Sequence, residues 1–147
     1  MRERVAILLL AVALDASIGV HAQEQPTFKA RLSPVPISAD MAARVTGSGS
    51  VTGALNGSTL TLAGLFTGLQ SPATTAHVHI GERIAVRGAA VFEVRIDQAT
   101  TGSLSATLEL SDAQIAALKR GLFYVQLHSE KAPEGNLWGW LLPEDKK

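Results

Sequence analysis

Two histidines separated by one residue, His77 and His79, are the first residues of this sequence whose spacing permits metal chemistry. They lie in the run TTAHVHIG, residues 74–81, and a third histidine, His128, follows much later in the chain. Neutral imidazole nitrogens bind zinc and copper, and a set of three leaves a coordination position open. Residues i and i+2 of a strand project from the same face, so this pair can approach one ion. The residue types therefore permit a three-histidine site for copper or zinc.

The same histidines also have a purely structural interpretation. Imidazoles on the polar face of a sheet can hydrogen-bond to carbonyls, hydroxyls or one another and so tie strands together. Whether His128 lies beside the other two depends on the strand order, which the sequence does not provide. Glu82, Glu130 and Asn136 are near the histidines in sequence and could orient metal-bound imidazoles, although each also suits a solvated loop or a strand edge.

A second candidate for binding is a group of three aromatic residues, Tyr124, Trp138 and Trp140. If these rings share one exposed sheet face, they form a flat platform for a sugar, a peptide or a partner protein. If a loop or a terminal segment covers them, they form a second small core, which is the more usual arrangement for such rings. The sequence leaves both arrangements open.

Motifs for the common catalytic mechanisms are missing from the sequence. It has no cysteine, no G-x-S-x-G elbow, no phosphate-binding glycine loop and no H-E-x-x-H. Ser129 follows His128 directly, but neighbouring residues of a strand point to opposite faces, so the two do not form a nucleophile and its base. We therefore predict that the protein is not an enzyme, and metal-dependent redox activity at the three histidines is the one catalytic alternative.

The first 22 residues predict a secretory signal peptide. Arg2 and Arg4 precede a short apolar run, residues 5–14, and the residues up to Ala22 suit signal peptidase. We expect cleavage after Ala22, export to the periplasm or the medium, and a mature chain, residues 23–147, that forms a single domain.

Composition narrows the classes of partner. The chain carries 13 basic and 13 acidic residues, and the signal would remove two of each, so the mature chain stays formally neutral. A neutral chain lacks the basic surface that nucleic acids and anionic membranes attract. Without cysteine, an exported chain has no disulfides and its stability depends on packing. No second long apolar run follows the signal, so we expect no transmembrane segment.

The remaining sequence is typical of short strands with one helix. Ser111, followed by Gln114 and later by Gly121, predicts a helix of about two to three turns. Asn56-Gly57 predicts a tight hairpin between two strands. We therefore expect an antiparallel, Greek-key-like β-sandwich of about seven or eight strands with one short connecting helix. The segments with strand-like patterns are 27–33, 50–55, 58–66, 76–80, 88–96, 103–110, 122–128 and 136–142.

The last two predicted strands can be placed in register. With residues 129–135 as the loop, antiparallel pairing sets Gln126 opposite Trp138. Two residues further along, Tyr124 lies opposite Trp140. The two histidines of residues 74–81 likewise point away from the aliphatic core. One face of the hairpin then carries Tyr124, Gln126, His128, Asn136, Trp138 and Trp140.

Three segments of the chain resemble the CHRD (chordin) domain family. FKARLSPVPI, TTAHVHIG and GLFYVQLHSEKAPEGNLWGWL are similar to the family's opening strand, its A-H-I-H-G segment and its G-x-Y-V-N-x-H…P-x-G-E-I-R-G-x-L ending, in that order. The resemblance covers about residues 27–143. It implies a β-sandwich that occurs in chordin, an extracellular antagonist of bone morphogenetic proteins, and in exported microbial proteins. The family's histidines fall on His77, His79 and His128.

Two segments depart from the family pattern. Residues 136–139 read Asn-Leu-Trp-Gly in place of Glu-Ile-Arg-Gly, and residues 81–83 read Gly-Glu-Arg in place of the usual Gly-Pro.

The sequence supports two functional hypotheses. The first is an exported CHRD-like domain that acts as a non-catalytic binding module for a protein or glycan partner. The second is a periplasmic protein that binds copper or zinc through its three histidines, which requires their nitrogens to lie close enough to share one ion.

Overall fold

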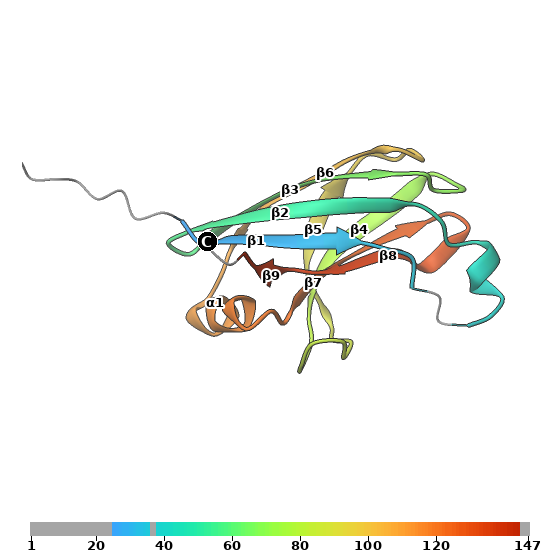
Figure 1. Cartoon of the computed structure of the whole chain (residues 1–147). Helices are drawn as coiled ribbons and strands as arrows, with labels where there is room; N and C mark the ends of the chain where they lie inside the picture. Colours follow the sequence, from blue (N-terminus) through green and yellow to red (C-terminus); the bar gives the residue numbers. More distant parts are fainter. Residues whose placement is uncertain (1–24, 36–37, 145–147) are drawn as a thin grey trace, which may run out of the picture.

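The computed structural model describes residues 25–35 and 38–144 (Figure 1). The predicted signal peptide, residues 1–22, lies outside the described residues. No helix of the described part is long and apolar enough to cross a membrane. The strands are β1 (Thr27–Leu32), β2 (Ser48–Asn56), β3 (Thr59–Thr67), β4 (Ala73–Ile80), β5 (Ala90–Ile96), β6 (Gly102–Glu109), β7 (Phe123–Ser129), β8 (Ala132–Trp140) and β9 (Leu142–Pro143); the helices are η1 (Met41–Ala43) and α1 (Asp112–Lys119).

All nine strands of the described residues belong to one antiparallel sheet, in the order β8-β7-β4-β5-β6-β3-β2-β1-β9. The sheet folds over so that β1, β2, β3 and β6 form one layer and β4, β7 and β8 form the other (Figure 1). β5 joins the layers, because it pairs with β4 and, through Arg95 and Ile96, with β6. All-β antiparallel architecture with one short α helix is thus confirmed.

The two outer edges of the sheet also meet, so the predicted sandwich of seven or eight strands is replaced by a nearly closed, barrel-like sheet of nine. Ser33, just past β1, and Trp138 of β8 exchange two backbone hydrogen bonds of 2.9 Å. β9 continues the same register along β1, where Phe28 faces Pro143. Closure gives partners to backbone groups that an open sheet would leave exposed at its edges.

Local sequence signals explain two connections. Asn56 faces Thr59 across the predicted tight turn, and Gly57 adopts a φ of 60° that suits glycine. At the start of α1, Ser111 Oγ accepts from the backbone N–H of Gln114, and Gln114 Oε1 accepts from the N–H of Ser111. This is the predicted capping box.

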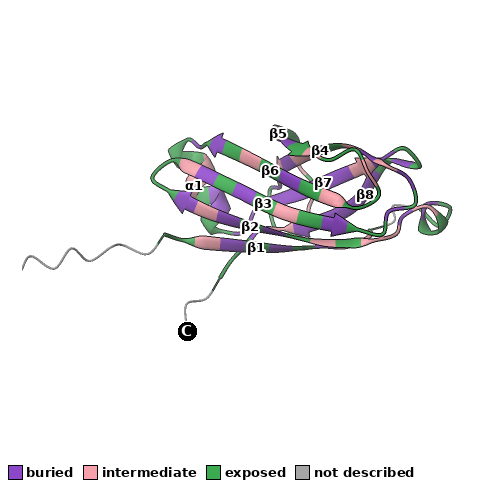
Figure 2. Cartoon of the chain, turned by 90° about the horizontal axis from the view of Figure 1, so that it is seen from above, coloured by how far each residue is buried: buried purple, intermediate pink, exposed green. Residues whose placement is uncertain are grey.

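The core lies between the two layers. Buried and exposed residues alternate along β2, β3 and β6, as the banded strands in Figure 2 show. Leu118 of α1 is fully buried and belongs to the same hydrophobic cluster, so the helix covers one end of the core. The largest fully buried apolar side chains are Phe28, Leu32, Leu60, Leu62, Phe66, Leu118, Phe123, Leu127, Leu137 and Leu141.

The hairpin of β7 and β8 has the predicted register from Tyr124 to Leu127, but the register shifts beyond Leu127 and the loop is shorter. Gln126 pairs with Trp138 and Tyr124 with Trp140, as expected. The expectation of a loop over residues 129–135 is wrong, because Ser129 pairs with Ala132 and only Glu130 and Lys131 connect the strands. An irregularity after Leu127 and a φ of 135° at Gly135 absorb the extra residues inside the paired region.

Candidate functional site

The sequence-predicted residues meet on the outer face of the layer formed by β4, β7 and β8. Two cross-strand rows bring them together: His77, Gln126 and Trp138 form one row, and His79, Tyr124 and Trp140 form the other. Cross-strand neighbours lie about 4.5–5.5 Å apart at Cβ, within contact distance for rings. We call this the aromatic-histidine face; its members are His77, His79, Tyr124, His128, Trp138 and Trp140.

The aromatic rings of this face form a stack. The centroids of His79 and Tyr124 lie 4.7 Å apart with 15° between the ring planes, and those of Tyr124 and Trp138 lie 5.7 Å apart at 5°. Trp140 packs against the same tyrosine at 4.6 Å with a tilt of 48°. The guanidinium carbon of Arg87 lies 4.0 Å from the centroid of the Trp138 ring, a cation-π contact.

Residues 81–89, between β4 and β5, cover the stack, and we call them the cover segment. Its main contact is Gly88, whose N–H donates to the Tyr124 hydroxyl at 3.1 Å. The Gly88 carbonyl accepts from His79 Nδ1 at 3.0 Å and from the Tyr124 hydroxyl at 3.1 Å. Tyr124 is only 1% exposed and Trp138 only 8%. A partner that is to reach these rings therefore has to displace the cover segment.

Glycine is needed at position 88 for this close contact. A Cβ atom there would lie 1.7 Å from the carbonyl oxygen of Ile80. Gly81, at the start of the cover segment, is under a similar constraint, because its Cβ would lie 2.2 Å from the carbonyl oxygen of Val86. The two glycines allow the cover segment to fold back against β4.

The three histidines lie side by side. The ring centroids of His77 and His79 are 6.2 Å apart and those of His77 and His128 are 5.7 Å apart, both pairs nearly perpendicular. Because β4 and β7 are neighbours in the sheet, His128 reaches the pair on β4. The rings meet edge to face, and no set of three or more His, Cys, Asp or Glu side chains in the described ranges is placed to hold a metal ion.

Two of the imidazoles have a defined tautomer when neutral. His79 Nδ1 bonds to the Gly88 carbonyl and His128 Nδ1 bonds to the Pro133 carbonyl at 2.8 Å. A carbonyl only accepts, so each Nδ1 carries the proton and each Nε2 presents a lone pair. Burial lowers the pKa of both imidazoles, and the nearby His77 lowers it further, against the opposing effect of the backbone bonds. These histidines therefore favour the neutral form.

Two polar atoms of the face are buried without a hydrogen-bond partner: His79 Nε2 and Trp138 Nε1. The first is an acceptor in the neutral tautomer and the second is a donor. Buried polar atoms nearly always have partners, so each such exception calls for an explanation such as a ligand.

The residues expected to support the histidines lie elsewhere. Glu82 and Glu130 are exposed, in the cover segment and in the turn between β7 and β8. Asn136 is fully buried, where its Nδ2 donates to the Thr46 carbonyl at 2.7 Å and its Oδ1 accepts from Ser129 Oγ at 2.8 Å. It joins β8 to the segment before β2 instead of orienting an imidazole.

Sequence reasoning missed Arg87 and Gly88, which make the closest contacts to the face from outside its strands. Gly81 follows the predicted strand 76–80 and Gly88 begins the predicted strand 88–96, and the two glycines at the ends of this mixed polar and apolar stretch were the one available signal. It also missed Glu93 of β5, which pairs with His77. Glu93 and His77 line a hollow of about 220 Å³, together with Thr74 and Thr75.

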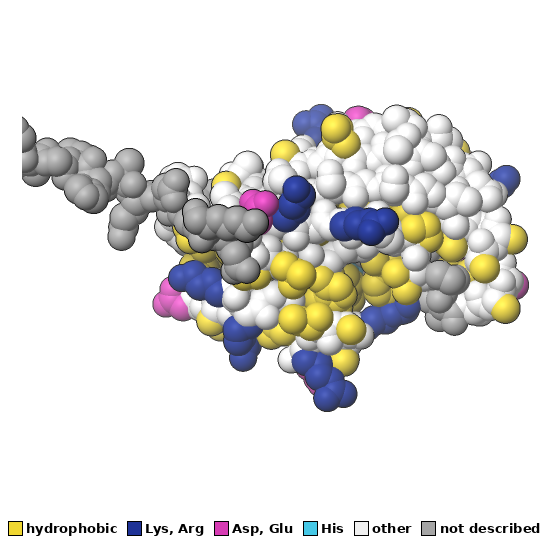
Figure 3. Space-filling model, in the orientation of Figure 1, with side chains coloured by type: hydrophobic (Ala, Val, Ile, Leu, Met, Phe, Trp, Pro, Cys, Tyr) yellow, Lys and Arg dark blue, Asp and Glu magenta, His cyan; other side chains and the backbone are white. Residues whose placement is uncertain are grey.

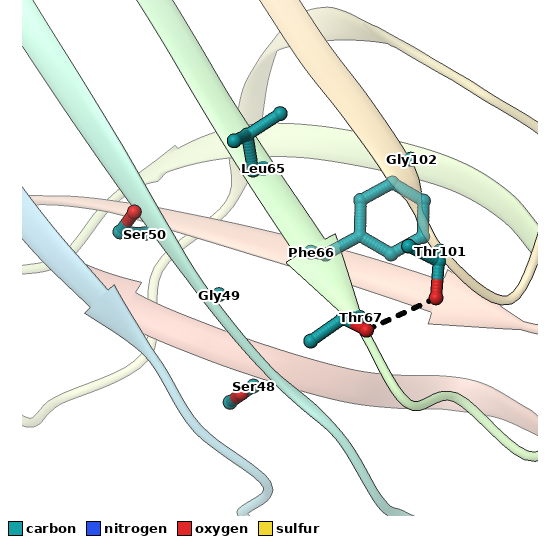
Figure 4. Close-up of a pocket in the computed structure, with 8 residues that line it drawn as sticks. All are labelled: Ser48, Gly49, Ser50, Leu65, Phe66, Thr67, Thr101 and Gly102. Carbon is teal, nitrogen blue, oxygen red and sulfur yellow. Dashed lines mark hydrogen bonds between the residues drawn. The ribbon is translucent and has the colours of Figure 1, made fainter.

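A second surface is the outer face of β2, β3 and β6, which is largely free of charged side chains (Figure 3). Leu65 is 66% exposed there and stands between two hollows of about 440 and 460 Å³. Figure 4 shows the first hollow, where the hydroxyls of Thr67 and Thr101 lie 3.0 Å apart. Its lining is mainly small hydroxyl side chains and glycines, and no unpaired buried polar atom lies among them.

Comparison with known proteins agrees with the motif-based resemblance. The sequence model of the CHRD domain matches residues 28–141, which include every member of the aromatic-histidine face. No curated protein matches the chain, and no solved structure does.

Proposed function

Because the chain belongs to the CHRD domain family, we propose that it is an exported, non-catalytic binding module that holds a protein or glycan partner at its aromatic-histidine face. CHRD domains are in general non-enzymatic modules. The signal-like N-terminus supports export, which would put the partner in the periplasm or the medium.

The observation that carries the proposal is the pair of unpartnered atoms, Trp138 Nε1 and His79 Nε2. Leaving a buried polar group unpaired costs about 1–3 kcal/mol. A partner that places a donor at His79 Nε2 and a separate acceptor at Trp138 Nε1, on the two sides of Tyr124, would remove this cost. The stacked rings beside the two atoms supply apolar contact area that suits a sugar ring or a peptide.

The surroundings of His128 also favour binding over catalysis. The hydroxyl of the adjacent Ser129 is buried and donates to Asn136 at 2.8 Å. It is therefore committed to a structural bond, and the imidazole of His128 is committed to the Pro133 carbonyl. Neither group has the pairing that activates a nucleophile.

The test measures binding of the mature chain to immobilised panels of synthetic peptides and oligosaccharides. His77→Ala and Trp140→Ala alter the face at residues that retain solvent contact, and Leu65→Ser is the control on the opposite layer. We expect the wild type and the control to bind the same probe, and each face variant to bind it at least about tenfold more weakly, or about 1.4 kcal/mol. An absence of binding on both panels, or binding that the face variants leave unchanged, would refute the proposal.

Metal binding is the second candidate, and the hydrogen bonds of the histidines favour it. Metal-bound histidines usually donate their other ring nitrogen to a carbonyl or carboxylate. His79 and His128 make this kind of bond through Nδ1, which leaves Nε2 available. Binding of one ion would require the rings to turn from their edge-to-face contacts with His77.

Calorimetric titration with copper(II), and separately with zinc(II), tests this candidate. We expect copper to bind more tightly than zinc, with one ion per chain and with loss of binding when all three histidines are changed to alanine. If neither ion releases heat or raises the melting temperature, the histidines serve only as hydrogen-bonding groups of the sheet.

A further inference from the structure

We infer that the aromatic-histidine face is a peptide-binding site that the chain's own cover segment occupies, and that a partner polypeptide carrying an Arg-Gly pair takes its place. This inference rests on the proposed function and specifies the partner. It comes from how Arg87 and Gly88 meet the face, which resembles a bound peptide more than an ordinary loop.

The face recognises the main chain of Gly88. Side chains of the sheet bind both polar groups of that residue: Tyr124 accepts from its N–H, and Tyr124 and His79 donate to its carbonyl. Hydrogen bonds to main-chain groups provide affinity without depending on a side chain, as in other modes of peptide recognition. Any extended peptide residue presents the same pair of groups.

The residue before this glycine supplies a side-chain contact. The Arg87 guanidinium carbon lies 4.0 Å from the centroid of the Trp138 ring. Tryptophan is the best aromatic partner for a cation. A peptide with arginine followed by glycine can therefore repeat both contacts at once.

The middle of the cover segment is weakly attached to the sheet. Residues 82–85 are exposed, including Ile84 at 53%. Ala85 has a φ of 66°, which is unfavourable for a residue with a Cβ atom. The only backbone hydrogen bond within the segment joins the Val86 N–H to the Arg83 carbonyl at 3.0 Å. Outside Arg87 and Gly88, two backbone hydrogen bonds hold the ends of the segment, from the Gly81 N–H to the Leu122 carbonyl at 2.9 Å and from the Ile80 N–H to the Ala89 carbonyl at 3.3 Å.

Tethering explains why the site is closed in the isolated chain. A short covalent connection gives the cover segment an effective concentration of about millimolar at the face. A partner peptide has to compete with the cover segment. Its apparent affinity is therefore its intrinsic affinity multiplied by the fraction of chains in which the segment has left the face. Weakening the segment's own contacts should therefore raise the affinity for an added peptide.

The experiment adds a synthetic peptide that copies residues 82–90, ERIAVRGAA, to three proteins: the wild type, Arg87→Ala and Gly88→Ala. Trp138 and Trp140 are the only tryptophans of the chain, so tryptophan fluorescence reports on this face. The matched control peptide is ERIAVAAAA. We expect the peptide to bind both variants at least tenfold more tightly than the wild type, and the control peptide to bind none of them at the same concentrations.

Circular dichroism shows whether each variant is folded, and Arg87→Ala changes only an exposed side chain, so at least one informative variant remains. Equal binding of the two peptides, or no binding to folded Arg87→Ala, would overturn the inference. Glycan binding on the panel without peptide binding would also overturn it while leaving the proposed function standing. A wild-type dimer that Arg87→Ala converts to a monomer would assign the site to a second copy of the chain instead of a partner.

Discussion

Replacing Tyr124 with phenylalanine should loosen the cover segment while leaving the stacked rings in place. The hydroxyl makes two hydrogen bonds of 3.1 Å, one from the Gly88 N–H and one to the Gly88 carbonyl. After the change, the carbonyl keeps its bond from His79, whereas the N–H loses its only protein partner. The loss is therefore concentrated on one buried donor.

The expected loss of stability follows from the number of hydrogen bonds that Tyr124→Phe removes. A typical hydrogen bond contributes about 0.5–1.5 kcal/mol net, and a donor left unpaired costs about 1–3 kcal/mol. The contact is only partly buried, so water can reach it once the segment shifts. We expect Tyr124→Phe to lower the free energy of unfolding by about 1–2 kcal/mol.

Urea unfolding followed by tryptophan fluorescence and by circular dichroism measures this change. Thr61→Val removes an exposed hydroxyl from β3 and should alter stability by less than about 0.5 kcal/mol. Combining Tyr124→Phe with Arg87→Ala should give less than the sum of the separate effects, because both changes release the same segment. A cost below about 0.3 kcal/mol for Tyr124→Phe, or full additivity, would refute the view that these contacts hold the segment cooperatively.

Three further predictions concern other contacts. Gly88→Ala should lower the free energy of unfolding by about 1–3 kcal/mol, because the new Cβ would meet the Ile80 carbonyl, and amide exchange should then rise in the cover segment. Hydrogen bonds from the Ser103 N–H and hydroxyl lower the pKa of the Asp97 carboxyl below its usual 3.8. The stability from that carboxylate is present above pH 3.8 and is lost as the pH falls through the lower folded pKa, so Asp97→Asn should flatten the acid limb of a stability curve measured below pH 4. Ser111→Ala removes the cap of α1 and should lower the melting temperature, at a cost of about 1 kcal/mol, whereas Ser111→Asp should preserve it.

Sequence reasoning succeeded where local chemistry decides the structure. Period-two alternation placed Gln126 opposite Trp138, and the Asn56-Gly57 turn and the Ser111 cap follow from residue types with strong conformational preferences. These features depend on neighbours in the chain, so no knowledge of the tertiary structure was needed.

The structural features that could not be predicted from the sequence depend on long-range contacts. The nine-stranded closure needs β9, a strand of two residues that includes Pro143, and no pattern of that length predicts a strand. The loop before Gly135 was expected to be long, because the sequence does not reveal which residues an irregular strand can absorb. The contact of Gly88 with Tyr124 links residues 36 apart, so neither residue type indicates the other.

The pairing of β1 with β9 also determines how the domain responds to mechanical tension. The Glu144 N–H donates to the Thr27 carbonyl at 3.0 Å, so the first and last strands end side by side (Figure 1). Force applied through these two ends would load the short β1 and β9 pairing one hydrogen bond at a time, in the manner of a zipper. Adjacent ends also allow the domain to sit within a longer polypeptide as a side branch, transmitting little strain to whatever lies on either side.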